Sequence, residues 1–499
     1  MPWTDFEWLS QIIFFFFYKH GGYLALLILK ATLLFLCWIP IALGIKDAEL
    51  PRPQLFAAFL FWATASISHS DLRPELFSLF FFAALLVSLE RRKTEPATLS
   101  WRWILWCCAI FSLWANLHAG FIFGGMLFAL YAATDLFNHD FTRFHEKALA
   151  AIFAVASTLI NPYGIGPYRI AWAHLQERSN LSHSINEWEA FTFSPPVHWP
   201  VDCAFVALFF AAGLLAISAR KRRDYQQEFP IFLLTLFLGI LTLFYRRFSA
   251  YFIIAFILAG SQFLKKGEFL SIKKKSWPSM TAALLCSLYI FRFASHVDWK
   301  SPFDSRLVCR RATAFLSQER RVISSLRVYN KWEWGGYLGW KLRPWFKIYC
   351  DGRYLFHDLL FKLSAAVPSP DTWQDFLNSQ NLNAALMPNF YREISTTRIY
   401  PDKTTRKFNR PWYLFFMPRK DWALVYWDDK ALFFVKRGSV SPSWLKQHEY
   451  RLWHPHDSAA LQDALNRREV SQSRLEKEQE RHLREISLAP PCAWRFSCS

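Results

Sequence analysis

The first 294 residues of the chain contain ten apolar runs of roughly 16 to 22 residues, which limit the possible folds more than any other feature. Each run can cross a bilayer as a helix, because a helical residue adds about 1.5 Å and the hydrocarbon core is about 30 Å thick. The composition agrees, since 53% of the 499 residues are hydrophobic and 50 are phenylalanine. We therefore predict an α-helical polytopic membrane bundle in contact with a lipid bilayer. Its expected helices cover 22–43, 54–69, 75–90, 101–117, 119–137, 147–161, 200–219, 229–245, 248–264 and 277–294.

Residues 1–21 precede this bundle, which we assign to 22–294. Residues 7–18 are predicted to lie at the membrane interface as an amphipathic helix. The first eleven residues, MPWTDFEWLSQ, contain two acids and no basic residue, so they do not resemble a signal peptide.

Basic residues divide unequally between the two sets of loops that alternate along the bundle. One set holds seventeen Lys and Arg residues, from Lys46 to Lys275, and the other holds six. The positive-inside rule places the richer face in the cytoplasm and both termini outside. The net charge of +19 is thereby explained by membrane orientation, and the short clusters between apolar runs argue against nucleic acid as a partner.

After the last run, residues 295–440 are predicted to form a smaller soluble α/β domain outside the membrane, and 441–499 a charged helical tail. The domain's most patterned stretch is 329–356, in which a strand at 326–329 leads to a turn at Gly335 and Gly336, a helix of about two turns ended by Pro344, and a strand at 347–350. Further expected elements are a helix capped by Asp371 and ending near Gln380, a strand at 384–387, and a hairpin of strands 422–427 and 431–436.

The nine cysteines include no CxxC pair, so no zinc site or thiol redox centre is predicted. Two disulfides are possible if this part of the chain is exported, Cys309 with Cys350 and Cys492 with Cys498, and the alternative is that these cysteines pack unpaired. The sequence names no cofactor, and it leaves a requirement for a divalent metal ion open.

Unusual polar residues collect in the predicted outer loops, so any chemistry is expected at the outer face. Asp5, Glu7 and Glu187 are the candidate catalytic carboxylates, because each could accept a proton from an acceptor hydroxyl. The alternatives are that Asp5 caps a helix, that Glu7 is fixed by a neighbouring loop, and that Glu187 holds its loop against the soluble domain. Trp188 and Glu189, next to Glu187, could present an aromatic platform and a second carboxylate to a sugar.

The remaining candidates are cationic or flank apolar spans, and we assign them to substrate binding. Arg73 could grip phosphate oxygens, or it could form a structural ion pair with Asp71. His118 could contact a diphosphate or sugar, or it could be an interhelical histidine. Arg246 and Arg247 lie on the face that is otherwise poor in basic residues, which suggests a bound anion, although lipid headgroups would also satisfy them.

Several motifs resemble a group of bacterial polytopic membrane proteins of the GT-C glycosyltransferase type, related to protein O-mannosyltransferases, oligosaccharyltransferases and lipid A aminoarabinose transferases. They are EWLSQ (7–11), LRPELFS (72–78), WANLHAGFIFG (114–124), LINPYG (159–164), NEWE (186–189), WEWGGYLGWKL (332–342), DGR (351–353) and WALVYWDD (422–429). The resemblance covers nearly the whole chain. It implies a sugar donor carried on polyprenyl phosphate, a glycan or protein acceptor, and transfer at the outer face of the bacterial cytoplasmic (inner) membrane, with a carboxylate of the first external loop as the base.

The chain departs from the group at its beginning, because similar proteins start with one more helix and an external aspartate, so residues 1–21 are expected to be a remnant of the first external loop. That departure keeps a second function open, a non-catalytic envelope scaffold or glycan-binding protein derived from such an enzyme. A transporter is a third option, but no pair of interrupted spans with charges near the midplane supports it.

Overall fold

The computed structural model describes residues 4–50, 52–66, 72–96, 98–176, 190, 213, 229–266, 277–295, 303, 307–353, 356–400 and 403–487. The chain divides into two compact units, Pro2–Val297 and Asp298–Trp494. Several predicted features lie outside the described residues: the span at 200–219 apart from Gly213, the candidates Asp71, Glu187, Trp188 and Glu189, and the cysteines Cys492 and Cys498.

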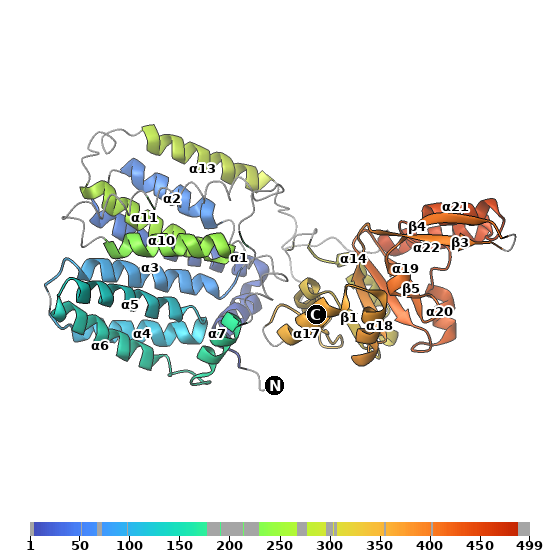
Figure 1. Cartoon of the computed structure of the whole chain (residues 1–499), viewed down its shortest axis with the longest axis horizontal. Helices are drawn as coiled ribbons and strands as arrows, with labels where there is room; N and C mark the ends of the chain where they lie inside the picture. The colour runs from blue at the N-terminus through green and yellow to red at the C-terminus, as the bar shows by residue number, and fades with distance from the viewer. Residues whose placement is uncertain are drawn as a thin grey trace. The chain divides into compact units, whose positions relative to one another are not determined.

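The N-terminal unit is a set of helices that lie side by side (Figure 1). Nine of the ten predicted spans coincide with helices in the described part of the chain. These are α1 (Trp8–Asp47), α2 (Arg52–Ser66), α3 (Glu75–Arg92), α4 (Trp101–Leu117), α5 (Phe121–Phe137), α6 (Phe141–Ser157), α10 (Phe229–Phe244), α11 (Ser249–Lys266) and α13 (Trp277–Ser295). A short helix α7 (Gly166–Gln176) and a 3-10 turn η4 (Arg246–Phe248) complete the unit.

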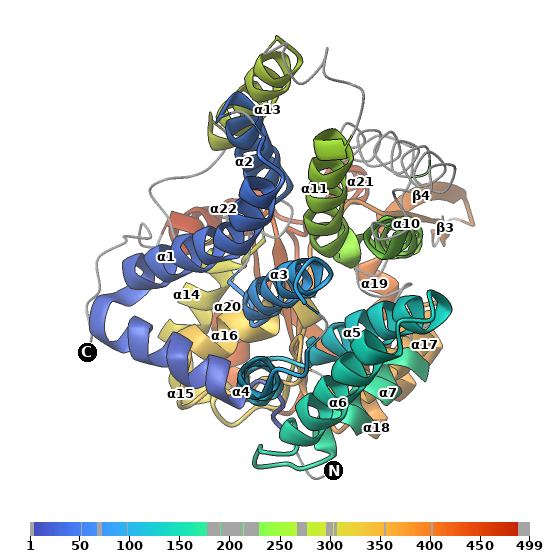
Figure 2. The same cartoon turned by 90° about the vertical axis from the view of Figure 1, so that its left-hand side faces the viewer.

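Helix α3 is at the centre of this unit. It contacts α1, α4, α5 and α11, and Figure 2 shows it in the middle of the other helices. Its buried residues, among them Leu79, Phe81 and Phe82, point to different sides of the helix. A helix that is apolar all round is stable only where other helices or lipid surround it. The position of α3 thus follows from its sequence.

Helix α1 differs from the prediction of an interfacial helix followed by a separate span. It runs for 40 residues, and only Gly22 has a non-helical backbone, with φ 66°. A positive φ costs glycine little, so the two predicted elements join at a kink. Before the kink Ser10 is buried, whereas Ile12 and Phe16 are exposed. The outward face is therefore apolar rather than polar, as suits contact with lipid.

Helix α6 begins six residues earlier than the predicted span at 147–161, because its first turns contain charged residues that are not part of the apolar run. Asp140 caps it by accepting a hydrogen bond from the Arg143 N–H at 3.1 Å. Glu146 and Lys147 are buried inside the unit, where they pair with Arg92 and Asp135. Part of the predicted basic face is thus a set of buried ion pairs between helices rather than loop charge.

Helix α1 is the one helix in the described part of the chain that is long and apolar enough to cross a membrane, with mean hydropathy 2.3. Helices α5 and α10 are apolar but shorter. A mostly helical chain with a small sheet region is confirmed, while ten membrane crossings remain a prediction.

The C-terminal unit contains a four-stranded sheet in the order β1 (Val328–Asn330), β2 (Ala384–Pro388), β6 (Ala431–Lys436) and β5 (Trp422–Trp427). Strands β1 and β2 are parallel and the other neighbours are antiparallel. Alternate side chains face two separate cores. Helices α14 (Arg310–Gln318) and α20 (Pro442–His448) contribute to one core, and α18 (Pro370–Ser379) and α19 (Tyr413–Phe416) to the other.

The patterned stretch 329–356 is only partly as predicted. Strand β1, a 3-10 turn η5 (Trp332–Trp334) and helix α16 (Gly335–Lys341) follow in the expected order, but 347–350 forms no strand. The buried side chain of Asn330 bonds this backbone instead, accepting from the Tyr349 N–H at 2.7 Å and donating to the Cys350 carbonyl at 2.8 Å. The Asn330 amide thus supplies the backbone hydrogen bonds that a neighbouring strand would have supplied.

One other prediction in this unit needs correction. Ser369, not Asp371, caps α18, and its hydroxyl accepts a hydrogen bond from the Thr372 N–H. Cys309 and Cys350 are both buried and unpaired, which agrees with the alternative of unpaired packing rather than with a disulfide.

A hairpin of β3 (Glu393–Ile399) and β4 (Thr405–Pro411) was not predicted, because its side chains are mostly polar and exposed. Ion pairs join it to the tail: Arg410 contacts Asp457 at 2.6 Å, just before α21 (Ser458–Asn466), and Arg406 contacts Asp463 within it at 2.6 Å. Helix α22 (Gln472–Ser487) follows α21. Further helices of the unit are α15 (Arg320–Ile323) and α17 (His357–Ala366).

Candidate functional site

Four of the motifs that carry the family resemblance meet at one end of the helical unit. Trp8, at the start of α1, donates from its indole to the Asn116 side chain at 2.9 Å. Ser10, two residues further along α1, donates to the Leu117 carbonyl at 2.5 Å. Asn116 in turn donates to the Ile160 carbonyl at 2.8 Å. These bonds tie residues 7–11 to the end of α4 and to the turn after α6.

His118, directly after α4, is held by the next part of this network. The Trp114 indole donates to the Ser78 hydroxyl at 2.6 Å, so the serine hydrogen is left to bond the His118 Nδ1 at 2.7 Å. The Gly120 N–H also donates to Nδ1, at 3.1 Å. An Nδ1 that accepts two hydrogen bonds carries no proton, so the neutral ring has its hydrogen on Nε2. Nε2 lies 3.7 Å from the Glu7 carboxylate.

Gly120 is required for this geometry. A Cβ at this position would lie 2.3 Å from the Ser78 Oγ and 3.0 Å from the His118 Nδ1. Both distances are shorter than van der Waals contact, so a larger residue would separate the serine from the histidine. The first glycine of the motif WANLHAGFIFG is thus explained by packing.

Glu7 lies just before the first turn of α1, in an unusual electrostatic environment. Its pKa is raised from 4.5 to about 7, chiefly by burial and then by the charges of Asp5 and Glu75, while the charges of Arg247 and Arg73 act to lower it. The Glu7 side chain is still 27% exposed. A carboxyl group with a pKa near neutrality can exchange protons at physiological pH, as a general base must.

Asp5 precedes α1 and contacts its beginning. Its carboxylate accepts hydrogen bonds from the Glu7 N–H at 3.3 Å and from the Gln11 side chain at 2.9 Å, whereas the helix itself has no side-chain cap. The negative charge of Asp5 is close enough to Glu7 to raise the pKa of that carboxyl group.

The structure therefore brings together Asp5, Glu7 and His118, with Arg73 and Arg247 close enough to influence the Glu7 carboxyl. Arg246 lies beside Arg247 in η4. Sequence reasoning assigned no role to Ser78, Glu75 or Trp114. All three belong to motifs of the family resemblance, since Glu75 and Ser78 lie in LRPELFS at the start of α3 and Trp114 lies in WANLHAGFIFG at the end of α4.

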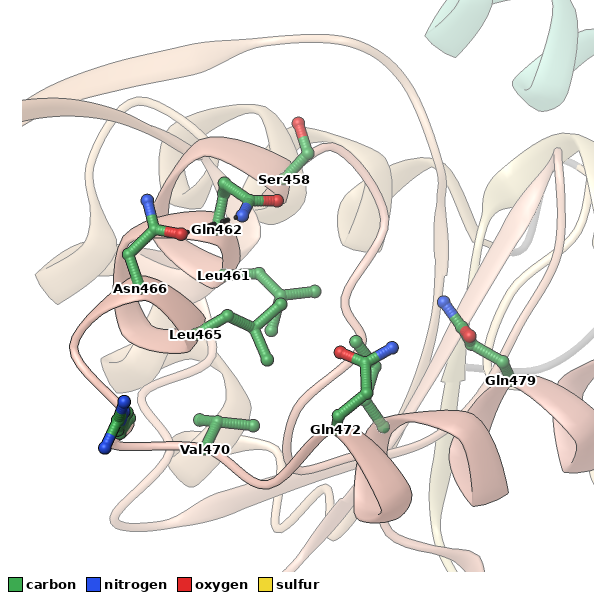
Figure 3. Close-up of a pocket in the computed structure, with 10 residues that line it drawn as sticks. Ser458, Leu461, Gln462, Leu465, Asn466, Val470, Gln472 and Gln479 are labelled. Carbon is green, nitrogen blue, oxygen red and sulfur yellow. Dashed lines mark hydrogen bonds between the residues drawn. The ribbon is translucent and has the colours of Figure 1, made fainter.

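No group of three or more His, Cys, Asp and Glu side chains able to hold a metal occurs among the described residues. The C-terminal unit has a cavity of about 530 Å³ between α21 and α22 (Figure 3). Leucine and valine side chains form its floor, and amides such as Gln462 and Gln472 surround it. Arg468 is its one charged lining residue, so it offers no acid or base.

Comparison with known proteins identified no matching family model and no matching curated protein. Among solved structures, the chain is similar to the oligosaccharyltransferase of Archaeoglobus fulgidus in a crystal structure with a tethered acceptor peptide containing the NVT sequon. The sequence identity is 12% and the TM-score 0.46, and the alignment covers 81% of this chain. The chain spans 65% of that enzyme's length.

Proposed function

We propose that this protein is a membrane glycosyltransferase that moves a sugar from a polyprenyl-phosphate donor to a glycan or protein acceptor at the outer face of the cytoplasmic membrane. The observation that carries the proposal is the meeting of Glu7, His118 and Ser78 from three distant motifs, with the charges of Arg73 and Arg247 nearby. The motifs that resemble GT-C glycosyltransferases supply the reaction class.

In the proposed reaction, Glu7 accepts the proton of the acceptor hydroxyl as its oxygen attacks the anomeric carbon. The bond from that carbon to the phosphate oxygen breaks, and polyprenyl phosphate leaves with the bonding electrons. Arg73 and Arg247 stabilise the negative charge on the leaving phosphate. His118 directs its Nε2 hydrogen toward Glu7 and thereby orients the base.

Burial of Glu7 is useful for this chemistry. A carboxylate with an ordinary pKa is a weak base at neutral pH, whereas one with a pKa of about 7 is a stronger base and is still partly ionised. The same burial and the neighbouring Asp5 and Glu75 that raise the pKa therefore tune the group for proton transfer.

The test is transfer from a polyprenyl-phosphate donor with a radiolabelled sugar, in nanodiscs. We expect Glu7→Gln to lower transfer by about 10²- to 10⁴-fold without loss of donor binding. Glu49→Gln, which removes an exposed carboxylate of the same unit, should leave the rate unchanged. If the wild type binds the donor and releases no polyprenyl phosphate under any condition, the protein is a non-catalytic glycan-binding protein instead.

A further inference from the structure

The C-terminal unit contains a second cavity, of about 280 Å³, whose chemistry differs from that of the amide-lined one. Its inner wall is apolar and aromatic, with Trp422, Leu424 and Phe434 from the sheet. Its outer part holds Arg419, Arg437 and Arg451, with Glu449 as the one acidic lining residue. The cavity is at the small end of ligand pockets, so it fits a group of about monosaccharide size.

Two of these arginines share a single carboxylate. Glu449, whose side chain is 6% exposed, accepts a hydrogen bond from Arg437 and another from the Arg451 Nε at 2.8 Å. This triad carries one net positive charge. Nearby Arg410 is neutralised separately, because it grips Asp457 with two hydrogen bonds of 2.6 and 2.7 Å.

Arg419 is the arginine that these carboxylates leave unneutralised. Its guanidinium contacts the His454 ring at 3.0 Å and the Arg451 carbonyl at 3.5 Å, both of which are uncharged partners. No carboxylate among the described residues lies within ion-pair distance of it. Burial and the adjacent Arg419 hold the pKa of His454 well below its ordinary value, so the ring is neutral and adds no charge.

Arg419 lines the cavity and is exposed, so a ligand can reach its guanidinium from solvent. Burial, followed by the nearby Arg410, lowers the pKa of Arg419, while the charges of Asp457, Tyr413 and Glu449 act in the opposite direction from beyond ion-pair distance. A ligand oxyanion would supply the missing charge, and a guanidinium can hold a phosphate or carboxylate through two parallel hydrogen bonds.

We propose that this cavity binds a monosaccharide-sized organic oxyanion, either a sugar phosphate or a uronic acid, with Arg419 as the anchor of its charged group. The sugar ring would lie against the apolar wall, and the Arg437–Glu449–Arg451 triad would border the anion. The proposal is independent of the glycosyl-transfer proposal, since all of its residues belong to the C-terminal unit and the ligand need not react.

The experiment is calorimetric titration of the full chain in a nonionic detergent without sugar headgroups. The probes are glucose 1-phosphate, glucuronate and, as the uncharged control, glucose. We expect saturable binding of at least one anionic sugar and none of glucose. Whichever anion binds more tightly identifies the charged group. Equal binding of glucose, or no saturable binding of either anion, would overturn the proposal.

Arg419→Gln should weaken binding of the preferred anion at least tenfold. The matched control is Lys420→Gln, which removes a neighbouring charge whose side chain is 81% exposed and should change binding less than twofold. Equal losses in the two variants would mean non-specific surface charge and would refute the assignment. If Arg419→Gln does not fold, Arg419→Lys decides, because it keeps the charge and loses the two-pronged geometry. Unchanged affinity in that variant would count against Arg419 as the anchor.

Discussion

Glu7 is expected to destabilise the folded protein at the pH at which it works. The perturbation is Glu7→Gln, which keeps the size of the side chain and removes its charge. A rise of the pKa from 4.5 to about 7 corresponds to roughly 3 kcal/mol at 1.36 kcal/mol per pH unit. Because the side chain is 27% exposed, solvent screening lowers this figure, and we expect about 1.5 kcal/mol.

The sign follows from proton linkage. Between pH 4.5 and about 7 the folded protein binds this proton and the unfolded chain releases it, so wild-type stability falls as the pH rises. The Glu7→Gln variant lacks this pH-dependent contribution to the free energy of unfolding. The variant should therefore match the wild type near pH 4.5 and exceed it by about 1.5 kcal/mol at pH 8.

The assay is denaturant unfolding in detergent at several pH values, compared between variant and wild type so that all other titrating groups cancel. Glu49→Gln serves as the control, because it makes the same chemical change at an exposed position of the same unit. A Glu7→Gln variant with the same stability difference at pH 5 and pH 8 would refute the reasoning, and so would one that becomes less stable at higher pH.

Three further substitutions test the packing. Gly120→Ala should separate Ser78 from His118, and should therefore lower the transfer rate and reduce the stability of the fold by about 1–3 kcal/mol. A Cβ at Gly125 would meet no atom within 4 Å, so Gly125→Ala should be neutral in thermal unfolding. Gly335→Ala would place a Cβ 2.0 Å from a backbone carbonyl and should reduce the yield of folded protein, while Gly336→Ala, again in open space, should not. Asn330→Ala should cost about 2–4 kcal/mol in denaturant unfolding, since it leaves two buried backbone groups without partners; a cost below 1 kcal/mol would contradict the bracing role.

Sequence reasoning could nominate much of the candidate site. Glu7, His118 and Arg247 stand out because ionisable groups beside apolar spans are costly unless they are paired or used. It could not join them, because the contact between Ser78 and His118 crosses 40 positions of sequence and depends on how α3 and α4 pack. Nor could it predict that the pKa of Glu7 is raised, since burial depends on the tertiary structure.

The fold shows the same limit. Apolar periodicity located the helices, because burial in a bundle or in lipid demands it. It failed where a side chain replaced regular structure, as Asn330 does for the expected strand at 347–350. It also missed β3 and β4, whose exposed polar strands are held by ion pairs to the tail rather than by a buried face.

The pH dependence of kcat/KM for sugar transfer tests the central claim most directly. With a labelled polyprenyl-phosphate donor and wild-type protein, we predict a rate that rises with pH and levels off above an apparent pKa of about 7, because Glu7 must be ionised to accept the proton. Glu7→Gln should remove that rise together with nearly all of the activity. A Glu7→Gln variant that transfers sugar at the wild-type rate with the same pH profile would contradict the assignment of Glu7 as the base.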